Sequence, residues 1–294
     1  MKSIITRALG AYINGLSLIA PQLSAKHAFY IFCYPFAAKL QSHHKAFLSS
    51  GTESIIAFEG KNIASYSWGH GSETILCVHG WQSNSFRWKK FIESFDHARY
   101  TVLAIDAPGH GASSGRILNV PMYARLIAQI MEETEIDFIL GHSMGCFSAL
   151  HAMHDETAKR PKAAVLLAAA ASAEEFVGFF KEIVGLSNRA ERELRIFFKS
   201  YVGHEVSYFE TNRYAPSMEF PALIIHDRGD LEIPVKYAQR LHEAWPQSEL
   251  VLTDGLGHRM RDISVVDQTI HFCDRHLQTN GETLRYQSNP SVLA

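Results

Sequence analysis

Hydrophobic and polar positions follow two alternating patterns along most of the chain after residue 50. Short apolar runs, typical of strands, are separated by stretches whose apolar residues recur every three or four positions, as in amphipathic helices. The predicted strands are ESIIAFEG, KNIASYSWG, ETILCVHG, YTVLAIDAPGHG, DFILGHS, AAVLLAAA, PALIIHD and SELVLTDG. The middle strands are continuously apolar, as in strands covered on both faces. This alternation predicts an α/β fold with a mostly parallel central sheet flanked by helices.

The connections between these strands are short and mostly helical. The predicted helices are SFRWKKFIESF, VPMYARLIAQIMEET, MGCFSALHAMHDETAK, PVKYAQRLHEAW and ISVVDQTIHFCDRHL. The first two strands are expected to form a hairpin that turns at Gly60-Lys61-Asn62 and to add an antiparallel edge to the sheet. Because ligands of parallel α/β sheets bind beyond the carboxyl ends of the strands, the loops at those ends are where functional residues are expected.

The first 50 residues form a separate region of the pattern. MKSIITRALGAYINGLSLIAPQLSAK has a basic start and an apolar middle, which is the outline of a signal peptide. However, Arg7 and Asn14 interrupt the apolar run, and the spacing of its apolar residues suits an amphipathic helix better. We therefore expect a helical extension over residues 1–50 and a cytoplasmic rather than a secreted protein. Its apolar face is expected to pack on the main domain, with contact to a membrane surface or a partner as the alternative.

A second departure from the pattern is the stretch of about fifty residues before PALIIHD, where one crossover would need far fewer. It predicts a cap of two or three helices at residues 171–221, between core segments 51–170 and 222–278, with a polar tail at 279–294. Most of its rings are expected to pack the cap onto the main domain, while Phe176 and Phe180 are candidates for an apolar substrate pocket. The rings are those of Phe176, Phe179, Phe180, Phe197, Phe198 and Tyr201. Arg189, Arg192 and Arg195 are expected to form a solvated helix face with nearby glutamates.

Composition narrows the function classes. The chain of 294 residues is 47% hydrophobic, enough for one large domain. Its 28 Lys and Arg nearly balance its 30 Asp and Glu, so no nucleic-acid partner is expected. The four cysteines form no C-x-x-C pair and the sixteen histidines no His-Glu-x-x-His motif. We therefore expect no disulfide framework, no metal site and no cofactor.

The candidate chemistry begins at Ser143. It lies between Gly141 and Gly145 in GHSMG, at the end of a predicted strand and the start of a predicted helix. Gly-x-Ser-x-Gly in that setting is a nucleophile elbow, a strained turn that projects the serine hydroxyl above the sheet. The glycines are needed because a Cβ at either position would collide with the neighbouring strand or helix. Ser143 is therefore the predicted nucleophile.

A serine nucleophile needs a histidine base and an orienting acid, which in this architecture follow in the order acid, then histidine. Asp227 and Asp230 both follow the strand PALIIHD. We favour Asp230 because it lies further out and can reach across the sheet, whereas Asp227 is expected to cap the turn through backbone amides. His258, in a glycine-flanked loop after the last strand, is the predicted base. His142 is expected to be structural or to line the pocket.

Two backbone N–H groups are predicted to hold the oxyanion that forms when a serine attacks a carbonyl. One belongs to Met144, directly after the nucleophile. The other is assigned to Trp81, which follows Gly80 in the loop after ETILCVHG. The Trp81 indole is expected either to lie near the acyl pocket or to cover the core.

Taken together, these motifs resemble the α/β-hydrolase fold superfamily, and in particular bacterial serine hydrolases of the esterase and lipase kind. The resemblance covers roughly residues 52–277. It is carried by His79-Gly80-Trp81, DAPGHGASSG at 106–115, GHSMG, HDRGDLEIP and GLGHR. It implies the triad of Ser143, Asp230 and His258, with a cap inserted where the extra helices are predicted.

The resemblance also implies what certain residues do not do. The loop DAPGHGAS is a structural corner in this family, so Asp106, Gly109 and His110 are given no catalytic role. Haloalkane dehalogenases and epoxide hydrolases of this fold need an aspartate where Ser143 stands.

The expected function is hydrolysis of carboxylic esters with small to medium, mainly apolar acyl groups through an acyl-enzyme. Thioester or carbon–carbon bond hydrolysis, acyl transfer and perhydrolysis remain alternatives on the same triad. A non-catalytic binding protein of the same fold and a lipid-surface enzyme docked through the N-terminal helices are further alternatives.

Overall fold

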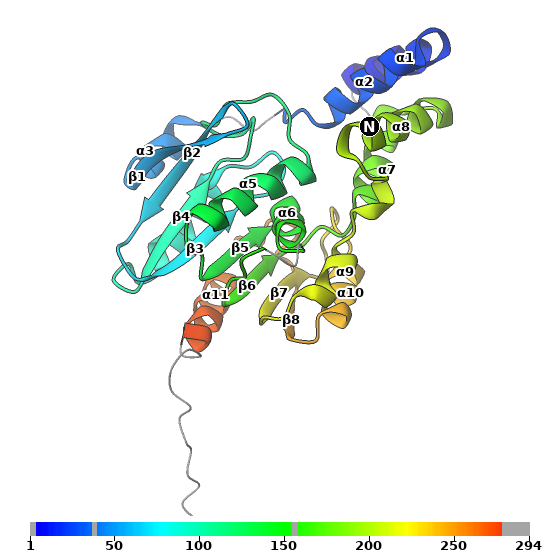
Figure 1. Ribbon diagram of the computed structural model, residues 1–294. Coiled ribbons are helices and arrows are strands. Elements are labelled where there is room, and N and C mark those ends of the chain that lie inside the picture. The colour runs from blue at the N-terminus through cyan, green and yellow to red at the C-terminus, as the bar shows by residue number, and fades with distance from the viewer. Residues whose placement is uncertain (1–3, 37–39, 155–157, 278–294) are drawn as a thin grey trace, which may run out of the picture.

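The structure, a computed structural model, describes residues 4–36, 40–154 and 158–277 (Figure 1). The tail predicted at 279–294 lies outside these residues. The strands are β1 (Thr52–Phe58), β2 (Lys61–Trp68), β3 (Glu73–Val78), β4 (Tyr100–Ile105), β5 (Phe138–His142), β6 (Ala163–Leu167), β7 (Ala222–Asp227) and β8 (Ser248–Thr253). The helices are α1 (Ile4–Ile19), α2 (Pro21–Phe32), α3 (Ser42–Leu48), α4 (Lys89–Ser94), α5 (Val120–Glu133), α6 (Met144–Ala152), α7 (Ala173–Val184), α8 (Asn188–Val202), α9 (Thr211–Tyr214), α10 (Lys236–Ala244) and α11 (Ile263–His276), with 3-10 turns η1 (Ser85–Trp88), η2 (Val206–Tyr208) and η3 (Ala215–Ser217).

One eight-stranded sheet, in the order β1-β2-β4-β3-β5-β6-β7-β8, organises the chain. β3 to β8 run parallel, whereas β1 pairs with β2 and β2 with β4 in antiparallel fashion. The predicted α/β class with a mostly parallel sheet and an antiparallel edge is therefore confirmed. From β3 the chain continues to β4 on one side and then to β5 on the other side. The carboxyl ends of β3 and β5 therefore lie side by side at one edge of the sheet.

Helices cover both faces of the sheet, because successive side chains of a strand point to opposite sides. In β3, Leu76 and Val78 join the core beneath α5, α6 and α10. Ile75 and Cys77 of the same strand join the core beneath α3, α4 and α11. All four side chains are fully buried, which explains the continuously apolar run in the sequence.

The β1–β2 hairpin turns one residue earlier than expected. Phe58 pairs with Lys61, so the turn consists of Glu59 and Gly60 rather than Gly60-Lys61-Asn62. Both turn residues have positive φ, 46° and 71°, as a two-residue turn that follows the twist of the strands requires. The predicted turn was one residue too late because Gly60 was taken as its first residue, whereas in the structure Gly60 is its last.

The helices between β6 and β7 pack against the N-terminal helices, and here two expectations were wrong. Phe29 of α2 contacts the rings of Phe197, Phe198 and Tyr201 of α8, with centroids 4.7–6.2 Å apart. These rings therefore join the cap to α2 instead of fastening it to the main domain. Equally, α1 and α2 pack mainly on α7 and α8 and not on the sheet. Figure 1 shows the four helices as one projection at the upper right.

The arginines of α8 do not share one role. Arg195 bonds Glu191 and Glu174, as the expected solvated face requires. Arg189 instead donates from Nε to the backbone carbonyl of Ser17, 2.9 Å away, and so holds the end of α1.

Helix α6 crosses β3 at very short range because Gly145 has no side chain. A Cβ on Gly145 would lie 2.2 Å from the carbonyl oxygen of Val78, closer than any carbon–oxygen contact permits. A Cβ on Gly141 would meet the α6 backbone at Cys146, 3.1 Å away. Both glycines are thus required by the approach of helix and strand, as the sequence predicts.

We predict that Gly145→Ala destabilises the protein by about 1–3 kcal/mol, because α6 must move away from β3. Gly178→Ala is the matched control, since Gly178 lies within α7 and a Cβ there has no neighbour within 4 Å. It should stabilise the protein by up to about 1 kcal/mol through helix propensity. Urea unfolding of both variants measures the difference, and equal free energies of unfolding would contradict the close approach.

Candidate active site

Ser143 occupies a strained turn between β5 and α6. Its backbone has φ 52° and ψ −120°, a conformation that non-glycine residues rarely adopt. The Ser143 N–H donates to the Leu167 carbonyl of the neighbouring β6 at 2.9 Å, and the Ser143 carbonyl accepts from Phe147 N–H. These bonds hold the turn, and the side chain is left above the carboxyl end of the sheet.

Backbone strain recurs around this point. Of the five non-glycine residues with positive φ in the described part of the chain, four belong to loops beyond the carboxyl ends of the parallel strands. They are Gln82 after β3, Ser143 after β5, Ala168 after β6 and Met260 after β8. Each such residue costs of order 1–3 kcal/mol and persists only where the surrounding structure fixes it, which is typical of functional sites.

Asp230, His258 and Ser143 form a continuous chain of hydrogen bonds. His258 Nδ1 lies 2.8 Å from Asp230 Oδ2, and in the tautomer that donates from Nδ1 to this carboxylate Nε2 is the acceptor nitrogen. That nitrogen lies 3.1 Å from Ser143 Oγ and can accept its proton. Three side chains from the loops after β5, β7 and β8 thus converge within proton-transfer distance.

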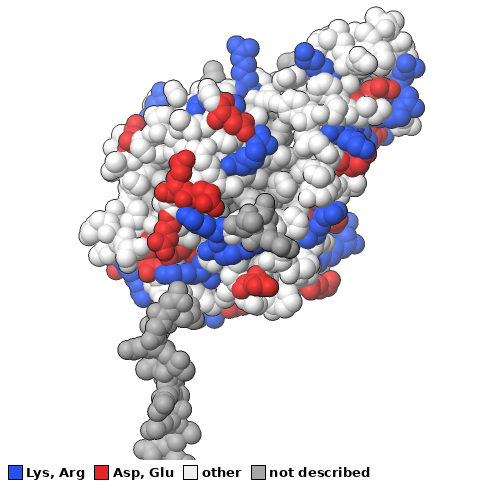
Figure 2. All heavy atoms as spheres, viewed as in Figure 1, with Lys and Arg blue, Asp and Glu red and all other residues white. Residues whose placement is uncertain are grey.

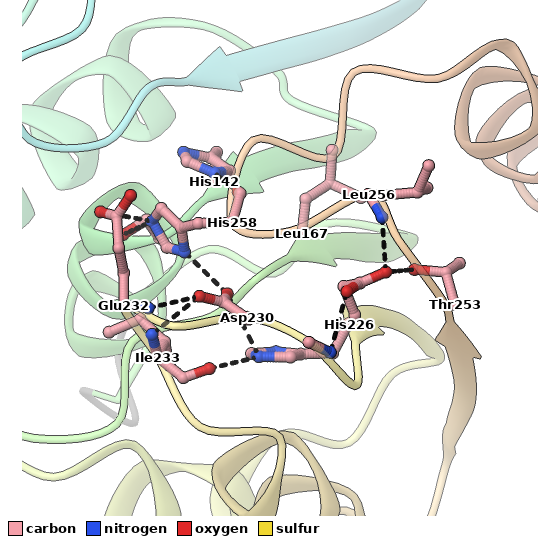
Figure 3. A network of polar contacts seen from close by, with 12 residues as sticks. His142, Leu167, His226, Asp230, Glu232, Ile233, Thr253, Leu256 and His258 are labelled. Atoms are coloured by element: carbon pink, nitrogen blue, oxygen red, sulfur yellow. Dashed lines mark hydrogen bonds and ion pairs between the residues drawn. The ribbon is translucent and has the colours of Figure 1, made fainter.

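The Asp230 carboxylate is held on both oxygens. Its Oδ1 accepts the N–H groups of Glu232 and Ile233 at 2.8 and 2.9 Å, while Oδ2 faces His258 (Figure 3). Burial opposes its ionisation, but the bond to His258 and these N–H groups together keep the pKa of Asp230 below its usual value. The carboxylate is therefore charged and orients the His258 ring.

Asp227 has the turn-capping role that its position predicts. Its Oδ1 accepts from Gly229 N–H at 2.9 Å, and its Oδ2 accepts from Leu256 N–H and the Thr253 hydroxyl, both also at 2.9 Å. The side chain joins the loop that carries Asp230 to the loop that carries His258.

Two buried side chains, those of His142 and Arg87, hold the backbone around His258 by hydrogen bonds. His142 Nε2–H donates to the His258 carbonyl at 2.9 Å, and Arg87 donates to the next carbonyl, that of Arg259, at 2.7 Å. Burial, with smaller contributions from nearby arginines, lowers the pKa of Arg87 to about 9. Burial likewise lowers the pKa of His142 well below its usual value, so His142 is neutral. His142 thus supports the His258 loop.

His79 sets the orientation of the peptide between Gly80 and Trp81. Its Nδ1–H donates to the Gly80 carbonyl at 2.7 Å, and its Nε2 accepts from Ala107 N–H at 3.0 Å. In a trans peptide the N–H points opposite to the carbonyl, so the Trp81 N–H points away from His79. A Cβ on Gly80 would lie 3.0 Å from Ser143 Cβ, which shows how closely this loop approaches the serine. Burial lowers the pKa of His79 to about 4, so the ring stays neutral.

The loop at 106–115 is a hydrogen-bonded corner beside the site. Asp106 is fully buried and accepts from Ser85 N–H and hydroxyl and from Ala112 N–H at 2.7–2.8 Å. His110 Nε2 accepts from Gln82 N–H at 3.2 Å, and burial lowers its pKa to about 3. These contacts give Asp106 and His110 structural tasks.

Three of the residues expected to line a substrate pocket make separate ring contacts. Trp81 is half-buried with its ring 5.5 Å from that of His110. Phe176 contacts Phe147, and Phe180 contacts Phe32 of α2. A cavity of about 710 Å³ lies at the far end of α6. Neither Ser143 nor any of the six predicted cap rings is among the residues that line it.

Sequence reasoning missed three supporting side chains, those of Arg87, His79 and His226. Arg87 occurs in an ordinary helical stretch, so no local signal distinguishes it from a solvated cation. His226 is fully buried, donates from Nε2 to the Ile233 carbonyl at 2.8 Å and lies 3.4 Å from Asp230. The position of His79 and His226 directly at strand ends was the available clue.

The fold agrees with comparisons to known proteins. A family model described as the alpha/beta hydrolase family matches residues 75–267. The chain is 40% identical, over 26% of its length, to the dihydrolipoyllysine-residue acetyltransferase component of the acetoin cleaving system of Cupriavidus necator. The chain spans only 20–29% of the length of the curated relatives that it matches.

Solved structures share the fold at low sequence identity. Est1E from Butyrivibrio proteoclasticus, solved with ferulic acid bound, superimposes with a TM-score of 0.64 at 18% identity over 76% of this chain and 99% of its own. A bacterial membrane phospholipase A superimposes with a TM-score of 0.61 at 16% identity over 91% of this chain and 96% of its own.

We predict that Asp230→Asn lowers the rate of fluorophosphonate labelling of Ser143 by about 10⁴-fold, because an amide cannot hold the reactive His258 tautomer. The matched control is Asp227→Asn, which should lower the melting temperature but leave labelling within about threefold. The assignment of the two aspartates would be overturned if the Asp227 variant lost labelling and the Asp230 variant kept it.

A second prediction concerns acid stability. An unfolded histidine takes up a proton near pH 6.5, whereas folded His79 and His110 do so only near pH 4 and 3. Their contribution to stability is therefore full above pH 6.5 and is lost as the pH falls towards 4.

Urea unfolding at pH 7, 6 and 5 measures this loss. His79→Gln removes one such group and should reduce the loss by about 1 kcal/mol per pH unit. His70→Gln, at an exposed position, is the control and should not change it. A free energy of unfolding that is constant from pH 7 to 5 would contradict the prediction.

Proposed function

The chain belongs to the alpha/beta hydrolase family, and from this premise we propose that it is a serine hydrolase that cleaves carboxylic esters. The observation that carries the proposal is the hydrogen-bond chain from Asp230 through His258 to Ser143, with distances of 2.8 and 3.1 Å. A nucleophile, a base and an orienting acid in that order are what acyl transfer to a serine requires.

In the proposed reaction His258 takes the Ser143 proton at Nε2 while Ser143 Oγ attacks the ester carbonyl. The backbone N–H groups of Met144 and Trp81 stabilise the oxyanion. Met144 is the first residue of α6, where a backbone N–H has no partner within the helix. The Trp81 N–H points away from His79, and its loop lies against Ser143.

His258 then returns the proton to the leaving alcohol, which leaves an acyl group on Ser143. A water molecule, deprotonated by the same nitrogen, attacks this acyl-enzyme and releases the acid. Asp230 keeps Nδ1 protonated throughout and stabilises the imidazolium that forms in each step. Its two backbone donors prevent rotation of the carboxylate between the steps.

We infer an acyl group of small to medium size and mainly apolar character. Leu231, directly after Asp230 in the chain, is an apolar side chain that is 98% exposed. Trp81 adds a half-buried indole beside the proposed oxyanion donor. Apolar surface with few polar groups is typical of pockets that bind uncharged acyl chains.

The experiment that tests the proposal is fluorophosphonate labelling with peptide mapping, followed by hydrolysis of p-nitrophenyl esters of graded acyl length. We expect one labelled residue, Ser143, and turnover that is greatest for short and medium esters. Ser143→Ala should lose labelling and lower kcat by about 10⁶-fold without changing the melting temperature.

Acyl-thioesters of the same chain lengths separate the proposal from its nearest alternative. A kcat/KM for thioesters well above that for esters would replace ester by thioester as the substrate class. An unlabelled Ser143 together with no turnover of either series would contradict a hydrolase and favour a binding protein of the same fold.

A further inference from the structure

Helix α1 places two of its polar residues, Asn14 and Ser17, on the side that faces α7 and α8. Asn14 donates from Nδ2 to the Gly185 carbonyl at 2.9 Å and accepts from Ser187 N–H at 2.8 Å. Ser17 is fully buried, and its carbonyl accepts from Arg189 Nε. Asn14 and Ser17 therefore fix α1 to the end of α7 and the start of α8, whereas Arg7, which also interrupts the apolar run, is exposed.

The outward face of α1 is correspondingly apolar. Exposed residues recur at helical spacing along it, namely Ile4, Ala8, Ala11, Gly15 and Leu18, with Ile5, Tyr12 and Ile19 beside them. Ile4 is 86% exposed, Leu18 68% and Ile19 84%. A contiguous exposed apolar face is typical of an interaction surface, so this face is expected to have an occupant. In Figure 2 the outermost end of the projection at the upper right is uncharged, and basic and acidic side chains lie beside and below it.

The neighbouring helices also carry exposed apolar side chains. Phe179 of α7 is 64% exposed, and Ile183 lies one turn further on. Directly after Ile183, Val184 of α7 lies against Gly10 of α1, where the two backbones approach closely. Exposed Tyr30 on α2 and Tyr34 just after it add rings of the kind enriched at the boundary between lipid and water. We call α1 with Phe179 and Ile183 the outer apolar face.

The charge of the N-terminal region indicates which kind of partner the outer apolar face binds. Residues 1–50 contain five Lys and Arg and no Asp or Glu, whereas the remaining chain has an excess of seven acidic residues. Among the cations, Arg7 and Lys26 are exposed on α1 and α2. A cationic, apolar surface complements an anionic lipid surface. Two copies of it would bring like charges together, which disfavours self-association through this face.

We propose that the outer apolar face docks on the surface of an anionic lipid bilayer, with α1 lying in the plane of the interface. Within the described residues, no helix has the length and apolar character needed to cross a bilayer, so α1 lies on the membrane rather than through it. Ile4, Leu18 and Ile19 enter the acyl boundary, while Arg7 and Lys26 meet lipid phosphates. This docking does not depend on the proposed hydrolysis, and its test requires no substrate.

The test is flotation of the full chain with vesicles of phosphatidylcholine alone or with about a third phosphatidylglycerol. We expect strong flotation with the anionic vesicles, weaker flotation with the neutral ones, and a decrease at high salt. Ile4→Glu with Ile19→Glu should lower partitioning by about tenfold or more. Ile263→Glu is the matched control, because Ile263 is also an exposed isoleucine at a helix start, 55% exposed, but belongs to α11.

A second variant tests the charge contribution. Arg7→Glu with Lys26→Glu should weaken binding to anionic vesicles and leave binding to neutral vesicles unchanged. Circular dichroism melting must show all variants folded, as expected for exposed positions.

Three outcomes would overturn the proposal. The full chain could fail to float with either vesicle. The Ile4 and Ile19 variant could float as the full chain does. Light scattering could show a dimer that this variant converts to a monomer, which would assign the face to a second copy of the chain.

Discussion

The arrangement of the site depends on how the Asp230 carboxylate is held. One oxygen is fixed by two backbone N–H groups of its own loop, which leaves the other for His258. Because the carboxylate cannot turn, the imidazole has one tautomer and one direction, and its free nitrogen faces Ser143. If these two N–H groups were displaced, three residues from separate loops would no longer share a line of proton transfer.

Much of the surrounding structure serves to keep loops in place rather than to contact a substrate. His142 and Arg87 bond consecutive carbonyls of the His258 loop, His79 bonds the Gly80 carbonyl, and Asp227 joins the loops after β7 and β8. Such buried polar groups are costly unless their partners are in place. Burial keeps His79 and His142 neutral, which lets each donate one hydrogen bond without adding a charge to the site.

The N-terminal helices and the cap form a second unit of packing on this core. Phe29 and Phe32 of α2 pack against aromatic rings of the cap. Asn14 of α1 forms hydrogen bonds with the backbone at the end of α7 and at the start of α8. The inner side of α1 carries Asn14 and Ser17, and its outer side carries mainly apolar residues together with Arg7. The same packing that stabilises the cap thus creates the surface that we propose for lipid contact.

The sequence by itself determined the strand order in the chain, the elbow at Ser143 and the choice of Asp230 over Asp227. These follow from local rules, because periodicity, glycine spacing and the distance from a strand end act over a few residues. Tertiary structure alone decided that the rings of α8 face α2 and that Asn14 points inward. It also decided that Arg87 is buried beside the His258 loop. Each of these depends on contacts between segments far apart in the chain, and no local pattern records which face of a helix meets which neighbour.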